Sequence, residues 1–263
     1  MLLECDLARG IPRGATHVPS ACARELGSHP RERRPLSPLA QTLHGDLSAR
    51  IAVDTRELLW AASPSTTVWR KRLHLAGPPE AGQVTSVVRF EAGAEFPRHD
   101  HPEGEEILVL EGVFSDEQGD WPAGSYLLNP EGFRHAPYSR GGCLLFVKLR
   151  QYPGTTRRHV ALSTGTLAWQ PLDGRATQLL YAQAGFTDST RLERWEPGAR
   201  APRLSYPQGA ELFVLRGSFS DEHGTYGPHT WLRLPAHSTQ SLATAEGCDL
   251  YVKEGGFAYL RAG

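Results

Sequence analysis

Three histidines and one glutamate are spaced in the sequence like the ligands of a single divalent metal ion. His99 and His101 are two residues apart, Glu105 follows after a Pro/Gly turn, and His135 follows a second such turn. Imidazole nitrogens and carboxylate oxygens are good ligands for first-row divalent metals. Residues two apart in a strand point to the same face, so His99 and His101 can face one interior. We therefore predict a metal site made by these four side chains.

Short β-type segments surround the predicted ligands. Runs at 84–90, 106–114, 125–128 and 143–149 are separated by glycine and proline residues. Many short strands with turn residues between them are typical of a sandwich or a barrel, and helical periodicity is weak along the chain. We therefore predict an all-β fold, in which His135 reaches the other ligands from a different part of the sheet.

The chain contains two copies of one β unit. The tetrapeptide Phe-Ser-Asp-Glu at 114–117 reappears at 219–222, a spacing of 105 residues. The same spacing relates several other pairs: Gly93 and Gly198, Gly112 and Gly217, Pro130 and Pro235, Cys143 and Cys248, and Lys148 and Lys253. Self-similarity at a fixed period is the signature of a repeat architecture. We predict one barrel over residues 46–157 and a second over residues 158–263.

The segment 1–45 differs from the rest of the chain in composition. Prolines and arginines recur there among small residues, and no helical or strand period survives. Such a composition is typical of a poorly ordered segment, and a wrongly assigned start codon would look the same. We expect residues 1–45 to form a disordered tail.

The second repeat serves as an internal control for the metal site. A shift of 105 residues places Leu204, Tyr206, Ala210 and Gln240 at the four ligand positions. None of these side chains is a usual ligand for a first-row metal, so we predict one metal ion per chain. Tyr206 could line a ligand pocket, although a packing role is the favoured interpretation.

The composition argues against nucleic-acid and membrane partners. The formal net charge is −1, and 40% hydrophobic and 22% charged residues are ordinary values for a globular protein. No excess of positive charge would attract nucleic acid, and no apolar run approaches the thickness of a bilayer. Four cysteines without a CxxC pair do not resemble a disulfide framework, and no secretory signal is evident. We expect a cytoplasmic protein.

Two segments of the first repeat resemble the two sequence motifs of the cupin superfamily. Residues 93–112 fit G-x5-H-x-H-x3-E-x6-G, and residues 124–135 fit G-x5-P-x-G-x2-H. The amino-acid sequence of residues 105–126 is similar to that of the ChrR-type cupins, which are named for the cupin half of a zinc-dependent anti-sigma factor. The resemblance implies two tandem cupin barrels (double-stranded β-helix or jelly roll), with the metal on His99, His101, Glu105 and His135. The x6 spacing favours Glu105 over the adjacent Glu106 as the carboxylate ligand.

The resemblance leaves two classes of function open, besides a barrel that a metal stabilises without any chemistry. One is a metal-dependent dioxygenase-like enzyme acting on a small diketone or hydroxylated ketone. The other is a ChrR-like sensor or binding module in an oxidative-stress response. Cys143 could be a redox thiol in such a sensor, although a buried structural thiol is the favoured interpretation. The ion would be iron, manganese or zinc, and the sequence offers no general base beyond the ligands. Sigma-factor binding is not favoured, because the N-terminal region lacks the CxxC pair of that anti-sigma domain; a homodimer stays open.

Overall fold

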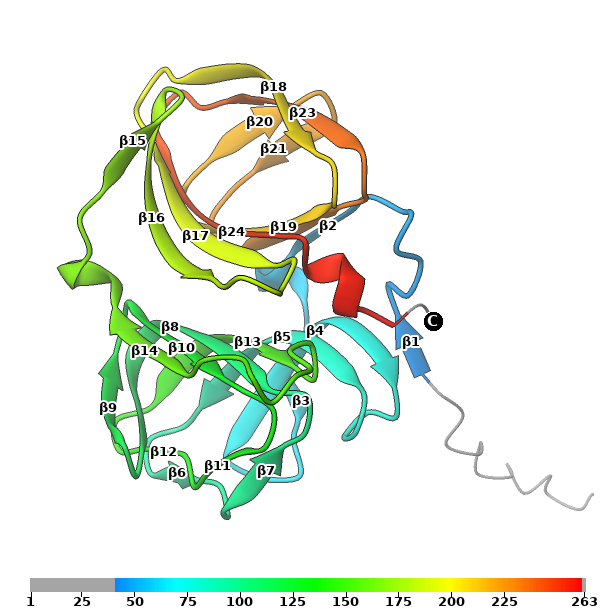
Figure 1. The fold of residues 1–263 in the computed structure, drawn as a ribbon. Coiled ribbons are helices and arrows are strands. Elements are labelled where there is room, and N and C mark those ends of the chain that lie inside the picture. The colour runs from blue at the N-terminus through cyan, green and yellow to red at the C-terminus, as the bar shows by residue number, and fades with distance from the viewer. Residues whose placement is uncertain (1–40, 262–263) are drawn as a thin grey trace, which may run out of the picture. The chain divides into compact units, whose positions relative to one another are not determined.

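The computed structural model of the protein describes residues 41–261, and the prediction for residues 1–40 falls outside this range. The described chain is almost entirely β-structure, as predicted, and forms two barrels (Figure 1). Short 3₁₀ turns are the only helical elements within it: η1 (Thr55–Glu57), η2 (Thr164–Thr166) and η3 (Gly256–Tyr259). No helix in residues 41–261 has the length and apolar character that crossing a bilayer demands.

The first barrel is built from an eleven-stranded sheet and a two-stranded ladder of β7 and β11. Its strands are β1 (Gln41–Leu43), β3 (Ala61–Ala62), β4 (Val68–Gly77), β5 (Gln83–Phe90), β6 (Ala94–Glu95), β7 (His99–His101), β8 (Glu105–Asp116), β9 (Gly119–Pro122), β10 (Ser125–Asn129), β11 (Phe133–His135), β12 (Tyr138–Ser139), β13 (Cys143–Leu149) and β14 (Val160–Ser163). β1 pairs with β4, so residues 41–43 of the predicted tail belong to this sheet.

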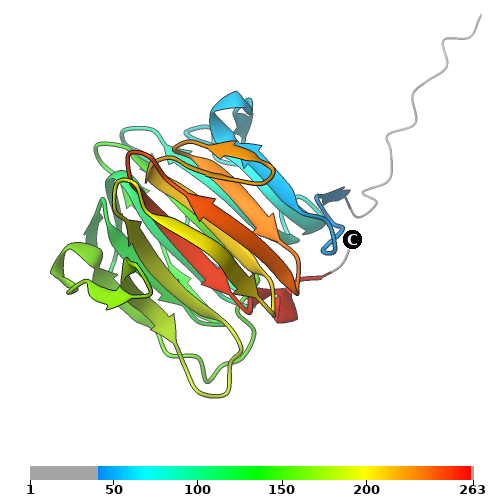
Figure 2. The ribbon, with the colours of Figure 1, turned by 90° about the horizontal axis from the view of Figure 1, so that it is seen from above.

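The second barrel is built from a seven-stranded and a four-stranded sheet. Its strands are β2 (Ile51–Asp54), β15 (Gln170–Leu172), β16 (Arg175–Ala182), β17 (Ser189–Trp195), β18 (Arg200–Tyr206), β19 (Ala210–Gly217), β20 (Phe219–Asp221), β21 (Gly224–Tyr226), β22 (Thr230–Leu234), β23 (Ser238–Ala243) and β24 (Cys248–Glu254). Seen from above, the strands from β15 to β24, coloured yellow-green to red, lie over those of the first barrel (Figure 2).

The two repeats exchange their first strands. β2 belongs to the first repeat in sequence but pairs with β22, joining Ile51 to Arg233 and Asp54 to Thr230. β14 belongs to the second repeat but pairs with β10 in the first barrel. Each barrel is therefore completed by a strand from the other repeat, and this exchange ties the two barrels together through backbone hydrogen bonds.

Strand alternation explains why the central strands are apolar on both faces. In β8, Ile107 packs inside the first barrel, whereas Leu108 packs between the barrels. In β13, Leu145 and Val147 face inward and Phe146 faces the second barrel. Sheets covered on both faces require such nearly continuous apolar runs. Residues 41–261 therefore contain three cores, one inside each barrel and one between them.

Reciprocal ion pairs lie in the core between the barrels. Lys148 of β13 pairs with Glu211 of β19, and Nζ of Lys253 in β24 lies 3.6 Å from Oε2 of Glu106 in β8. The two glutamates are 105 residues apart, as are the two lysines, so one contact repeats the other with the barrels interchanged. The interface thus has the self-complementary pattern of a two-fold dimer within one chain.

Replacement of Lys148 by methionine tests how strongly these pairs hold the fold. We expect Lys148→Met to lower the free energy of unfolding by about 3–5 kcal/mol, because Glu211 would stay buried without its cation. The measurement is urea unfolding followed by tryptophan fluorescence. Arg134→Met is the matched control: its ion pair with Asp100 is exposed and should matter by less than about 1 kcal/mol. Equal losses in both variants would contradict a structural role for the buried pair.

Candidate metal centre

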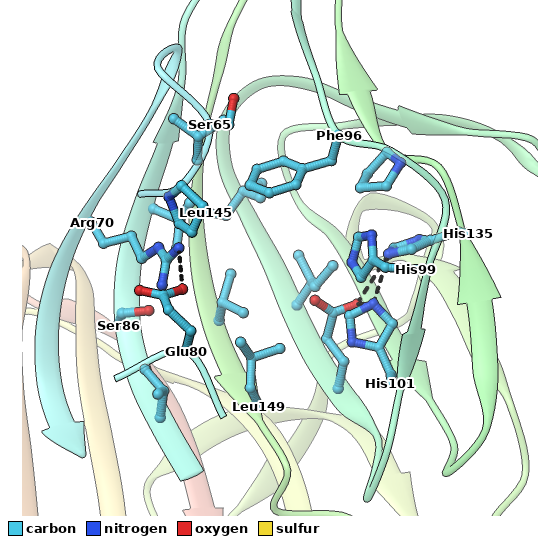
Figure 3. Close-up of a pocket in the computed structure, with 18 of the residues that line it drawn as sticks. Ser65, Arg70, Glu80, Ser86, Phe96, His99, His101, His135, Leu145 and Leu149 are labelled. Atoms are coloured by element: carbon cyan, nitrogen blue, oxygen red, sulfur yellow. Dashed lines mark hydrogen bonds and ion pairs between the residues drawn. The ribbon is translucent and has the colours of Figure 1, made fainter. Parts of the chain in front are cut away.

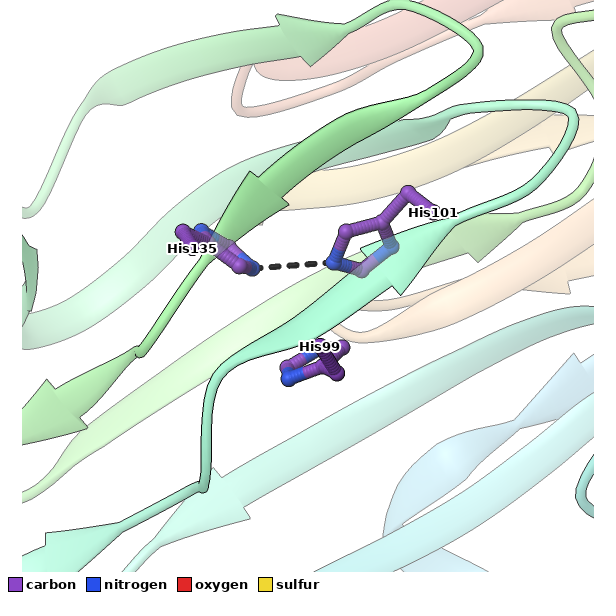
Figure 4. Close-up of side chains that lie close together, drawn as sticks. All are labelled: His99, His101 and His135. Atoms are coloured by element: carbon purple, nitrogen blue, oxygen red, sulfur yellow. Dashed lines mark hydrogen bonds between the residues drawn. The ribbon is translucent and has the colours of Figure 1, made fainter.

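The ladder between β7 and β11 places the three predicted histidine ligands on one face. His99 lies directly opposite His135 in this antiparallel pair, and His101 lies opposite Phe133. His101 is two residues from His99, so strand alternation directs both side chains to the same side. Figure 4 shows the three imidazoles gathered at this ladder.

The imidazoles converge closely enough to share one ion. Nε2 of His101 lies 2.9 Å from Nε2 of His135, and one ligand nitrogen from each histidine lies within 4.8 Å of the others. His101 and His135 are buried, with 6% and 1% of their surface exposed, whereas His99 is partly exposed. The three histidines can therefore hold a metal ion that remains accessible from one side.

Glu105 lies beside this cluster at the first position of β8. Its Oε2 is 3.5 Å from Nε2 of His101 and 3.7 Å from Nε2 of His135. The turn before it is tight: Gly104 has a φ of +72°, and a Cβ there would lie 2.8 Å from the carbonyl oxygen of Asn129. Only glycine adopts this conformation without strain, so Gly104 fixes where Glu105 enters the barrel.

Neighbouring groups determine which nitrogen of His99 and of His135 carries the proton. Nδ1 of His135 lies 3.1 Å from Oδ2 of Asp116, and Nδ1 of His99 lies 2.8 Å from the carbonyl oxygen of Pro97. Both partners accept hydrogen bonds, which assigns the proton to Nδ1 and leaves the lone pair on Nε2. A carboxylate in this position orients a ligating histidine and increases its basicity.

The pKa values of the two buried histidines move in opposite directions. Burial lowers the pKa of His101, so this imidazole is neutral near pH 7. Burial also opposes protonation of His135, but its hydrogen bond to Asp116 and the charge of Glu105 together raise its pKa. A bound cation would compete with the proton for the Nε2 of this residue.

The sequence analysis does not predict two residues that contact the candidate ligands, Asp116 and Asn129. Asp116 lies in the repeated Phe-Ser-Asp-Glu turn, whose recurrence at 105 residues was the available signal. Asn129 donates a hydrogen bond from Nδ2 to Oε2 of Glu105, at 3.0 Å. The spacing of residues along the sequence does not indicate the contact between Asn129 and Glu105, because it depends on the pairing of β10 with β8 in the sheet.

A cavity of about 800 Å³ opens beside the histidines. Ile107, Leu145 and Leu149 contribute to its apolar lining. Figure 3 shows the histidines on one wall and Arg70, paired with Glu80, on the opposite wall. Phe133 packs edge-on against His135, with ring centroids 5.5 Å apart. A small organic molecule would fit between the two walls.

Glu106 points away from this cavity, which agrees with the preference for Glu105. Its carboxylate accepts hydrogen bonds from Tyr126 at 2.6 Å, from Thr190 at 2.9 Å and from Tyr251 at 3.0 Å. Burial would raise the pKa of Glu106, but Lys253 and the tyrosine hydroxyls lower it. This glutamate is therefore committed to the interface between the barrels.

The second barrel has the framework of the first site without its donors. Leu204 pairs with Gln240 across β18 and β23, as His99 pairs with His135. Gln240 donates a hydrogen bond to Asp221 at 2.7 Å, in the manner of His135 with Asp116. Within residues 41–261, the only cluster of metal-ligating side chains is that of the three histidines.

Known proteins resemble this chain in both sequence and structure. The ChrR cupin-like domain family matches residues 48–153 and again residues 157–258. A search of curated proteins gives no match.

Several solved structures share the fold. A candidate dioxygenase from Nostoc punctiforme is 16% identical with a TM-score of 0.68, over 82% of this chain and 86% of that chain. Oxalate decarboxylase from Bacillus subtilis is 12% identical with a TM-score of 0.57, over 78% and 76%. The pirin YhhW from Escherichia coli, in complex with nickel(II), is 16% identical with a TM-score of 0.56, over 78% and 98%.

These likenesses agree with the predicted motifs and with the two observed barrels. At such identities the solved structures show a common fold, while the family match extends over nearly all of the described chain. The protein therefore belongs to the ChrR cupin-like family and carries two copies of its domain.

Proposed function

We propose that the protein is a metal-dependent, dioxygenase-like enzyme acting on a small diketone or hydroxylated ketone. One divalent ion would be held by His99, His101, Glu105 and His135. The observation that carries the proposal is the convergence of three imidazoles and one carboxylate at the wall of an apolar cavity. A purely structural metal would have no need of such a cavity.

The chemistry of the donor set supports this assignment. Four protein ligands leave one or two coordination positions for a substrate with two neighbouring oxygen atoms. A metal there would supply Lewis-acid or redox chemistry. Ile107, Leu145 and Leu149 would exclude water around the carbon skeleton of the substrate, while Asp116 and Asn129 hold two of the ligands in orientation. The fold-level likeness to a candidate dioxygenase is compatible with this reaction class.

A sensor of oxidants or small ligands is the second candidate function. The family match to the ChrR cupin-like domain favours it. The thiol of Cys143 offers little support, because burial raises its pKa to about 11 and so keeps it protonated at neutral pH. A sensing role would therefore depend on the metal itself, with the cavity receiving the ligand that is sensed.

The metal content of the purified protein tests the site first. We expect about one iron, manganese or zinc ion per chain by elemental mass spectrometry, and a loss of most of this metal in His135→Ala. Gln240→Ala, at the equivalent position of the second barrel, is the matched control and should retain the metal. Two ions per chain, or full occupancy in His135→Ala, would contradict the assignment.

Asp116 tests the orientation of the ligand His135. We expect Asp116→Asn to weaken metal binding by about 10–100-fold, because an amide neither orients the imidazole nor increases its basicity as a carboxylate does. Competition with a chromogenic chelator measures this affinity. Asp221→Asn removes the equivalent carboxylate of the second barrel and should leave the affinity unchanged. A similar loss in both variants would point to a general effect on folding.

Oxygen consumption distinguishes the enzyme from the sensor. The iron-loaded protein should consume oxygen in an electrode cell when acetylacetone or a hydroxylated aromatic ketone is added. Glu105→Gln should abolish this uptake. Glu211→Gln is the control, because it makes the same change outside the candidate metal centre, and it should consume oxygen at the wild-type rate. Circular dichroism would establish that this control variant is folded. Metal-loaded protein that binds these ketones without consuming oxygen would favour the sensor.

A further inference from the structure

A second cavity, of about 400 Å³, opens in the barrel that lacks the histidines. It is lined by β18, the strand that corresponds to the ligand-bearing β7 of the first barrel, and by β16 and β17. Tyr206, which stands at the position of His101, forms part of the wall. The cavity thus occupies the same place in its barrel as the candidate metal centre does in the first.

The two cavities differ in the charge of the residues that line them. Four arginines and two carboxylates line the second cavity: Arg175, Arg191, Arg200, Arg203, Asp173 and Glu254. Three arginines and four carboxylates line the first: Arg70, Arg98, Arg150, Glu80, Glu95, Asp100 and Glu105. The first lining suits a bound cation, whereas the second has an excess of positive charge that would attract an anion.

Arg175 and Arg191 are held in place by the buried carboxylate of Glu193. Glu193 accepts a hydrogen bond from Nε of Arg191 at 2.7 Å, and it lies 3.0 Å from Nε of Arg175. The same glutamate accepts a hydrogen bond from the indole of Trp195, and Glu254 accepts another from Arg191 at 2.6 Å. Each guanidinium has five N–H donors, so these contacts orient the groups without using all of their donors.

The other two arginines, Arg200 and Arg203, are not held by a carboxylate, and Arg203 has lost the partner that the first repeat provides. Arg98 forms an ion pair with Glu117 at 2.5 Å. Arg203 and Glu222 occupy the equivalent positions, but within residues 41–261 no carboxylate lies within ion-pair distance of Arg203 or of Arg200. The pairing of β18 with β23 shifts in register between Ala201 and Leu204, which both line the cavity, and β-bulges are common next to binding sites.

We propose that this cavity binds a small organic oxyanion, a dicarboxylate or a phosphate ester, through Arg175, Arg191, Arg200 and Arg203. Guanidinium groups match carboxylate and phosphate oxygens in paired hydrogen bonds. The volume suits a molecule of a few carbon atoms. This second site is independent of the metal, and the degenerate repeat keeps a binding cavity whose specificity has changed from a cation to an anion.

Isothermal titration calorimetry of the metal-loaded protein tests this site with succinate and with inorganic phosphate as probes. We expect saturable binding of at least one probe, weakened about tenfold or more in Arg203→Gln and in Arg200→Gln, since each removes a charged hydrogen-bond donor. Succinamide, the neutral analogue of succinate, should not bind. Tighter binding of succinate would assign a dicarboxylate, and tighter binding of phosphate would assign a phosphate ester.

Arg98→Gln is the matched control, because it makes the same change at the equivalent position of the first barrel. It should leave the affinity within about twofold of wild type. An anion spread over the surface would respond equally to the two variants, and an anion bound at the metal would lose affinity in Arg98→Gln alone, which would also contradict the proposal. An equal effect of the two variants would overturn the proposal. So would the absence of binding by both probes at millimolar concentration, or equal binding of succinamide.

Discussion

The packing of the two barrels against each other is the constraint on which the remaining structure depends. Phe146 and Phe213 stack between the barrels with ring centroids 4.6 Å apart, and the pairs of Lys148 with Glu211 and of Lys253 with Glu106 lie buried around them. Buried charges persist only where each has a partner. In the first barrel, the sheet that contains β8 and β13 must therefore contact the second barrel with its outer face, while its inner face lines the cavity beside the histidines.

Because β8 has a cavity on one face and the other barrel on the other, its adjacent glutamates, Glu105 and Glu106, have different partners. Alternation along the strand sends Glu105 to the histidines and Glu106 to Lys253. A shift of register by one residue would exchange these roles and place Ile107 at the interface. The interface therefore secures the register of the strand from which the candidate centre takes its carboxylate. The exchange of β2 and β14 strengthens this arrangement, since neither barrel is complete without the other repeat.

The two repeats present linings of different charge on one scaffold. Asp116 and Asp221 have equivalent places, but one accepts from the imidazole of His135 and the other from the amide of Gln240. The turns and the orienting carboxylate remain in the second barrel, while Leu204 and Tyr206 fill the space of the histidines. The buried lysine and glutamate of the interface are common to both repeats, whereas the side chains at the four ligand positions differ.

The sequence by itself determined the fold class and the repeat, and it predicted the four ligands, because all of these depend on local spacing. His99 and His101 share a face through strand alternation, and the 105-residue repeat is visible in the order of the turns. Only the tertiary structure decided which distant residues meet: the contact of Asn129 with Glu105, the burial of Lys148 and the arginine-lined cavity. Such contacts join strands far apart in the chain, and no periodicity along one strand specifies the pairing of another.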